Sequence, residues 1–301
     1  AASDVYKRQH MFNTVIEMLS YPFMTRAFLV GSLVALCSAL LGVSLVLKRY
    51  SMIGDGLSHV GFGAMAIAAA MNAAPLTIAI PVVIVAAILL LRISGNAKIK
   101  GDAAIALIST TSLAVGVMVI SLTTGMNTDV YNYMFGSILA MSAEDVKLSL
   151  VLSVFVLILF IVFYHKIFAI TFDETFARAT GVKAGVYNTL IAVLTAVTIV
   201  LGMRMMGALL ISSLIIFPAL TSMRVCRTFK SVIINAAVIS VVCLIAGVTL
   251  SYVAATPAGA SVVLANLVMM VLYTVVGVVK NHMRSVSYTH LRAHETRSNL
   301  V

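Results

Sequence analysis

The chain alternates long apolar stretches with short basic clusters, and this alternation limits what it can fold into. Most of the stretches are roughly 17–25 residues long, the length at which an α-helix spans a lipid bilayer. Only 10% of the 301 residues are charged and 61% are hydrophobic, whereas soluble domains carry about 25% charged residues. These features exclude a soluble globular protein.

The apolar stretches predict an all-α polytopic membrane protein with about eight or nine transmembrane helices. Several stretches are short, so a count of ten stays open as an alternative. The expected spans are Ala27–Leu47, Gly56–Met71, Leu76–Leu91, Ala103–Thr124, Leu148–Ile170, Thr189–Met203, Gly207–Met223, Ser231–Ala254 and Ala260–Val279.

Lysine and arginine gather at every second connection between these spans, and the connections between those are poor in both. By the positive-inside rule the basic connections are cytoplasmic, which predicts an external amino end and a cytoplasmic carboxyl end. The basic residues lie in separate loops and form no single solvated face, so we expect no nucleic-acid partner. The basic clusters are Lys48-Arg49, Arg92 with Lys98 and Lys100, Lys166 with Arg178 and Lys183, Arg224 with Arg227 and Lys230, and Lys280 with Arg284. The connections poor in basic residues are Asn72–Pro75, Gly125–Lys147, a tight turn at Arg204–Met206, and Ala255–Gly259.

The two ends differ in character from the apolar body. Residues 1–10 are polar and precede a methionine at position 11, and residues 285–301 are equally unlike the sequence before them. Residues 1–10 lack the order of regions found in a signal peptide. We expect both ends to be non-native and residues 11–284 to form the membrane domain.

Asp55 and His59 are the strongest chemical signal in the chain. On a helix they are four residues apart, about 6 Å along the axis and on the same face. A carboxylate and an imidazole placed in this way can hold one cation, and these donors suit Zn²⁺, Mn²⁺ or Fe²⁺. A charged side chain within the bilayer costs about 2.5–3.5 kcal/mol, so an aspartate there needs a partner, water or a function.

A structural role for the same pair is the alternative. Asp55 could cap the start of its helix and accept a hydrogen bond from His59. The neighbouring glycines at positions 54, 56, 61 and 63 favour a functional role, because they permit close backbone approach or an irregular helix start.

A second constellation lies in the longest cytoplasmic connection, residues 171–185. Thr171 as N-cap and Glu174 as the third helical residue predict a capping box, and Gly181 is a suitable C-cap. Phe172, Phe176 and Ala177 are the expected apolar anchors of this short amphipathic helix. It either lies on the membrane surface or docks into a cytoplasmic partner.

The external connection also contains an apolar segment, Tyr131–Ser142. It is too short to span the bilayer and carries aromatic residues suited to the interface. We expect a short interfacial or re-entrant helix, with a plain loop as the alternative.

Four runs, in this order, resemble the membrane permeases of zinc, manganese and iron ABC importers. They are MIGDGLSHVGFGAMAIA, TFDETFARATGVKAG, MMGALLISSLIIFPALTSMRV and TPAGASVVL. The resemblance covers essentially all of residues 11–284. It implies a homodimeric, lipid-embedded permease with a vitamin-B12-importer-like fold in a bacterial plasma membrane. It also implies two kinds of partner, namely cytoplasmic ATPase subunits and an extracellular metal-binding protein.

The resemblance further assigns roles to single residues. Asp55 and His59 match an Asp-x-x-x-His of the family that lines the metal path. The connection over residues 171–185 matches the family's coupling helix, which inserts into the ATPase. The residues expected to act there are Phe172, Asp173, Glu174, Phe176, Ala177, Arg178 and Gly181. The transported ion, zinc first and manganese next, would be cargo, with no permanently bound cofactor.

Two other functions stay open on the residues. A secondary metal/proton transporter would use the same pair without an ATPase. An intramembrane metalloenzyme would need a third ligand or a water-activating carboxylate on another span. No nucleotide-binding loop, zinc-protease motif or nucleophile elbow occurs in the sequence. We therefore expect a non-enzymatic subunit whose energy is supplied by a partner.

Overall fold

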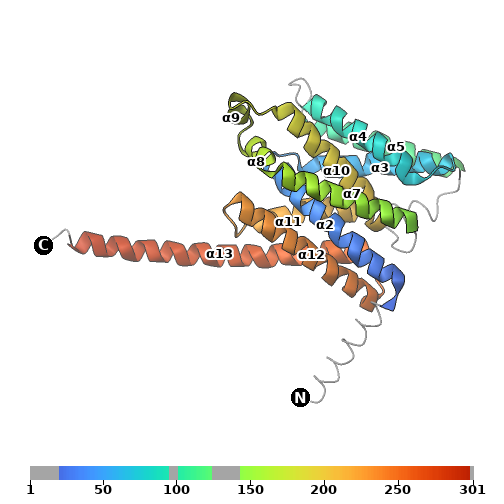
Figure 1. Cartoon of the computed structure of the whole chain (residues 1–301). Helices are drawn as coiled ribbons and strands as arrows, with labels where there is room; N and C mark the ends of the chain where they lie inside the picture. Colours follow the sequence, from blue (N-terminus) through green and yellow to red (C-terminus); the bar gives the residue numbers. More distant parts are fainter. Residues whose placement is uncertain (1–19, 95–100, 124–142, 299–301) are drawn as a thin grey trace, which may run out of the picture.

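The computed structural model describes residues 20–94, 101–123 and 143–298, with side chains as far as Lys280. All regular structure within these ranges is helical (Figure 1). The helices are α2 (Pro22–Leu47), α3 (Ser51–Ala70), α4 (Pro75–Ser94), α5 (Gly101–Thr123), α7 (Ala143–Val162), α8 (Tyr164–Phe172), α9 (Glu174–Ala179), α10 (Ala184–Met206), α11 (Ala208–Met223), α12 (Phe229–Ala254) and α13 (Ala258–Ser298).

Eight of the described helices are long and apolar enough to cross a membrane. They are α2, α3, α4, α5, α7, α10, α12 and the Ala258–Lys280 part of α13, and α11 is a shorter apolar helix. This result confirms the predicted all-α membrane fold. The expected fifth span, Leu148–Ile170, is divided near Phe163 into α7 and α8.

Three helices form the centre of the bundle. The apolar windows of α2, α3 and α10 are about two thirds or more buried, whereas less than a third of each window in α4, α5, α7 and α13 is buried. Helix α3 packs against α4, α5, α10 and α11, and α2 packs against α7, α10, α11 and α12. The exposed faces of the outer helices are apolar, as expected of surfaces that meet lipid or another membrane subunit.

Small residues bring the central helices close together. A Cβ on Gly63 would lie 2.7 Å from the carbonyl oxygen of Ser112, and a Cβ on Gly42 would meet the backbone of Ile215. Such close approach is typical of helix packing in membranes, where van der Waals contact takes the place of a hydrophobic driving force.

The predicted tight turn after the sixth span is present, but it lies at Gly207 and not at Arg204–Met206. Helix α10 continues through Met206, and the chain turns at Gly207, whose φ of 85° and ψ of 162° suit glycine almost alone. Met205 and Met206 are buried in the bundle, and Arg204 Nη2 lies 3.7 Å from Asp145 Oδ2 at the start of α7. Hydropathy cannot distinguish the protein interior from lipid, so the burial of this turn does not follow from the sequence.

Candidate functional site

Helix α3 carries both residues of the expected ion pathway. The two side chains lie on one face, with His59 Nε2 3.8 Å from Asp55 Oδ2. The Asp55 side chain is 47% exposed and that of His59 is 21% exposed. Both groups are therefore reachable from outside the chain although α3 is the most buried of the spans. An open carboxylate and imidazole can accept an ion without the protein having to unfold locally.

Ser212 on α11 joins this pair in space. Its Oγ lies 3.4 Å from Asp55 Oδ1 and 3.2 Å from the carbonyl oxygen of Ala208, one turn earlier. Ser212 could not be predicted from the sequence, because it is 157 residues from Asp55 and no local spacing links the two. Its hydroxyl can orient the carboxylate and share its charge.

Asp55 does not cap its helix, so that alternative is wrong. The N-cap of α3 is Tyr50, which makes no side-chain capping bond, and Asp55 is the fifth residue of a regular helix. The distance of 3.8 Å to His59 is also longer than a hydrogen bond. The glycines of α3 permit close approach to other helices, since Gly54 faces Ile215 and Gly63 faces Ser112. The other expected role, an irregular start of the helix, is absent from α3.

The second predicted constellation is placed at the junction of α8, α9 and α10. Thr171 is not the N-cap, because α8 continues through it and its hydroxyl donates to the carbonyl oxygen of Ile167. Asp173 caps α9 instead and accepts a hydrogen bond of 2.9 Å from the backbone N–H of Phe176. Helix α9 ends at Ala179, and Gly181 follows in the left-handed region with φ 86°.

The three expected apolar anchors of this loop differ in how far the chain itself buries them. Ala177 is buried, but Phe172 and Phe176 are 61% and 66% exposed. Phe172 ends α8, where its ring lies 4.9 Å from that of Phe168 and 5.7 Å from that of Phe229. The exposed Phe172 at the end of α8 and the exposed Phe176 in α9 form an apolar projection that is available to a partner or to lipid.

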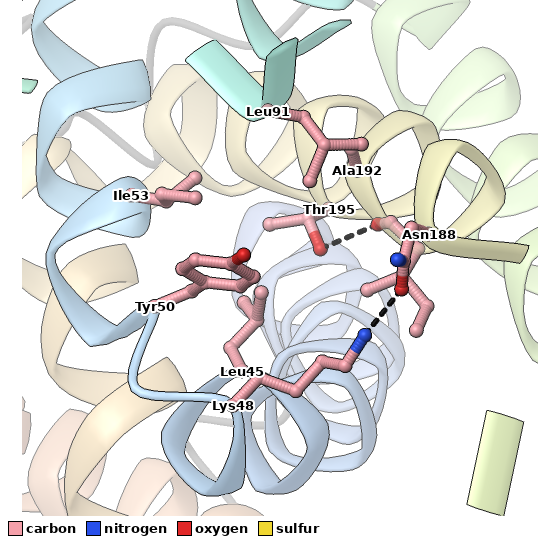
Figure 2. A pocket seen from close by; sticks show the side chains of 9 residues that line it. Leu45, Lys48, Tyr50, Ile53, Leu91, Asn188, Ala192 and Thr195 are labelled. Atoms are coloured by element: carbon pink, nitrogen blue, oxygen red, sulfur yellow. Dashed lines mark hydrogen bonds between the residues drawn. The ribbon is translucent and has the colours of Figure 1, made fainter. Parts of the chain in front are cut away.

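Glu174, the first residue of α9, points back toward the bundle. Its Oε2 lies 3.4 Å from Lys48 Nζ and 3.0 Å from Asn188 Nδ2, and its Oε1 accepts a hydrogen bond from Arg178. Lys48 Nζ also donates to Asn188 Oδ1, across a small pocket lined by Leu45, Tyr50, Ile53, Leu91 and Thr195 among others (Figure 2).

The opposite charges of Glu174 and Lys48 stabilise each other. Burial works to raise the pKa of Glu174, but the hydrogen bonds from Asn188 and Arg178 and the charge of Lys48 outweigh it, and the pKa lies below the usual glutamate value. Burial lowers the pKa of Lys48, against the opposing attraction of Glu174. Glu174 is therefore ionised at neutral pH and holds the lysine side chain in place.

No group of three or more His, Cys, Asp or Glu side chains that could hold a metal ion occurs within residues 20–94, 101–123 and 143–280. In the described part of the chain, no third side chain of these types therefore joins Asp55 and His59. The predicted interfacial segment Tyr131–Ser142 lies outside the described residues.

Membrane proteins of metal transport systems align with most of this chain. It is 28% identical over 248 residues to the manganese transport system membrane protein MntC of Halalkalibacterium halodurans, covering 82% of this chain and 85% of that protein. It is 30% identical over 246 residues to the high-affinity zinc uptake system membrane protein ZnuB of Haemophilus influenzae, covering 82% of this chain and 94% of the relative.

A solved structure has the same fold. The PsaBC complex of Streptococcus pneumoniae contains a chain that superposes with a TM-score of 0.78 at 26% identity, over 87% of this chain and 94% of that one. The model of the ABC 3 transport family matches residues 20–277. These findings confirm the resemblance to metal-importer permeases. The chain belongs to the ABC 3 transport family.

Proposed function

We propose that the chain is the transmembrane permease subunit of an ATP-driven importer of divalent transition metal ions, with zinc as the first candidate and manganese as the second. One observation carries the proposal: Asp55 and His59 lie 3.8 Å apart, accessible, on one face of a membrane-spanning helix. The relatives named for manganese and zinc transport support the class of cargo. They also leave the choice between the two metals open.

A site with two protein donors suits a transported ion. Four firm ligands would hold zinc too tightly for rapid release, whereas two donors and water permit entry and exit. In a homodimer the two copies would together offer two carboxylates and two imidazoles along the path. The ion crosses as alternating access opens the spans to one side at a time.

Helix α9 is proposed as the contact with a cytoplasmic ATPase. The exposed rings of Phe172 and Phe176 project from the end of the bundle that carries Lys48 and Lys183, the end expected in the cytoplasm. An apolar projection of this kind fits a groove in a partner. An extracellular metal-binding protein would deliver the ion to the opposite side of a bacterial plasma membrane, where the amino end is expected.

Two alternatives differ in what they require. A metalloenzyme needs a third ligand near Asp55, and the described side chain that contacts Asp55 from another helix is Ser212, which offers a hydroxyl. A secondary transporter would move the ion without ATP. The membership of an ABC family favours the ATP-driven importer over both.

Metal uptake by cells that depend on this chain tests the pathway. Asp55→Ala and His59→Ala should each lower the uptake of radioactive zinc or manganese by at least about tenfold, since each removes one of the two donors. Asp102→Ala and His165→Ala are matched controls, because both residues are exposed and lie outside the site. Wild-type uptake by the Asp55 and His59 variants, at normal amounts in the membrane, would contradict the assignment.

A further inference from the structure

The α2–α3 turn is tied to the helix proposed for ATPase contact by side chains that are far apart in the sequence. Lys48 follows α2, Glu174 begins α9, and Asn188 lies in the first turns of α10. Each of these three side chains contacts the other two: Lys48 with Glu174 at 3.4 Å, Asn188 with Glu174 at 3.0 Å, and Lys48 with Asn188. Three segments therefore meet at one closed polar triangle.

This triangle is more than a surface ion pair. The Lys48 side chain is only 9% exposed, and it runs past Leu45 toward Asn188 along one wall of the apolar pocket shown in Figure 2. Exposed pairs contribute little, but loss of Glu174 would leave the buried charge of Lys48 without its carboxylate, and loss of Lys48 would leave Glu174 with Arg178 and Asn188 as its partners. Replacing either charged residue should therefore disturb the junction itself.

The turn that carries Lys48 is short and firmly bonded. The backbone N–H of Lys48 donates to Ser44, that of Arg49 to Val46, and that of Tyr50 to Leu45. Arg49 takes the left-handed conformation with φ 61°. Helix α3 begins at Ser51, and Asp55 lies in its second turn. A displacement of Lys48 is thus passed along a stiff turn to the start of the helix that bears Asp55.

We propose that Lys48, Glu174 and Asn188 form the link through which a movement of α9 reaches α3 and its Asp55–His59 pair. The inference rests on the proposed importer function. It gives Glu174 and Lys48 an internal positioning role, distinct from the exposed phenylalanines that would meet the ATPase. Loss of the link leaves ATP hydrolysis in place but separates it from ion movement.

A double-mutant cycle on the reconstituted complex tests the link. The chain is placed in proteoliposomes with its ATPase and its metal-binding protein, and the metal transported per ATP hydrolysed is measured. Lys48→Met and Glu174→Gln should each lower this ratio by about threefold or more, and the double variant should be no worse than either single one. Lys48→Arg, which keeps the charge, should retain most of the wild-type ratio.

Arg49→Met is the matched control, because it removes a neighbouring exposed positive charge of the same turn. It should keep the wild-type ratio. If Lys48→Met fails to reach the membrane, Asn188→Ala provides the second test, with the same expected loss.

Two results would overturn the inference. One is a wild-type ratio in the single variants, and the other is a double variant whose loss equals the product of the single losses. Failure of the proposed function gives a different result, namely no ATP-dependent metal accumulation by the wild-type complex. Accumulation by the wild type, with unaffected Lys48 and Glu174 variants, rejects the link alone.

Discussion

Asp55 and Ser212 show how a carboxylate in a membrane helix is stabilised by a contact between helices. The Oγ of Ser212 is 3.4 Å from Asp55 Oδ1, a long hydrogen bond. His59 Nε2 lies 3.8 Å from the other carboxylate oxygen. Each oxygen of Asp55 thus has a neighbour of its own, and an incoming cation would be held at the oxygen that faces His59.

Replacing Ser212 should weaken the site without abolishing it. A hydrogen bond to a charged group is worth about 1.5–3 kcal/mol, and this one is long, so Ser212→Ala should raise the KM for metal uptake by up to about tenfold. Ser213→Ala is the control, since the hydroxyl of Ser213 bonds within its own helix, to Leu210. Equal KM values for the two variants would remove Ser212 from the site.

Helices α3 and α5 depend on small residues to pack closely. Gly63 of α3 faces the backbone carbonyl of Ser112 in α5, and neither backbone can yield as a flexible side chain would. Helix α9, in contrast, is short and has exposed aromatic surface, so its role depends on what it contacts outside the chain. The packing of α3 against α5 is therefore tested by stability, and the role of α9 by the binding of a partner.

Substitution of Gly63 should destabilise the fold. Gly63→Ala places a Cβ 2.7 Å from the carbonyl oxygen of Ser112 and should cost about 1–3 kcal/mol through overpacking. Thermal unfolding in detergent should show a Tm lower by several degrees. Gly185→Ala, where no atom lies within 4 Å of the new Cβ, should leave the Tm unchanged or slightly raised. Equal Tm values for the two variants would show that α3 and α5 are not packed in this way.

Phe176 should contribute directly to binding of the ATPase. The side chain is 66% exposed, and burial of a phenylalanine in a partner is worth about 1.5–3 kcal/mol. Phe176→Ala should weaken the binding of purified ATPase to the detergent-solubilised chain by about tenfold or more. Leu122→Ala, which removes an apolar side chain that is 78% exposed at the far end of α5, should have no effect. An unchanged Kd for Phe176→Ala would exclude that ring from the interface.

At the scale of the whole molecule, much of the fold was predictable from the sequence because a bilayer demands long, internally bonded helices. Hydropathy alone therefore predicted the spans. The burial of Met205 and Met206 was not predictable, since an apolar turn looks the same whether protein or lipid surrounds it. Thr171 was the wrong cap because α8 extends past it, which leaves Asp173 to begin α9.

The candidate site was predictable to a similar extent. The spacing of Asp55 and His59 placed them on one face because both belong to one helix. Ser212, Lys48 and Asn188 gave no such signal, because their partners lie on other helices and only packing brings them together.

The central claim is that ATP hydrolysis drives a metal ion past Asp55. Proteoliposomes that contain the chain, its ATPase and its metal-binding protein test this most directly, with uptake of radioactive zinc measured with and without ATP and with manganese as competitor. We expect uptake that requires ATP in the wild type and is lost in Asp55→Ala, although ATP is still hydrolysed. Uptake driven by a proton gradient without ATP, or full ATP-dependent uptake by Asp55→Ala, would contradict it.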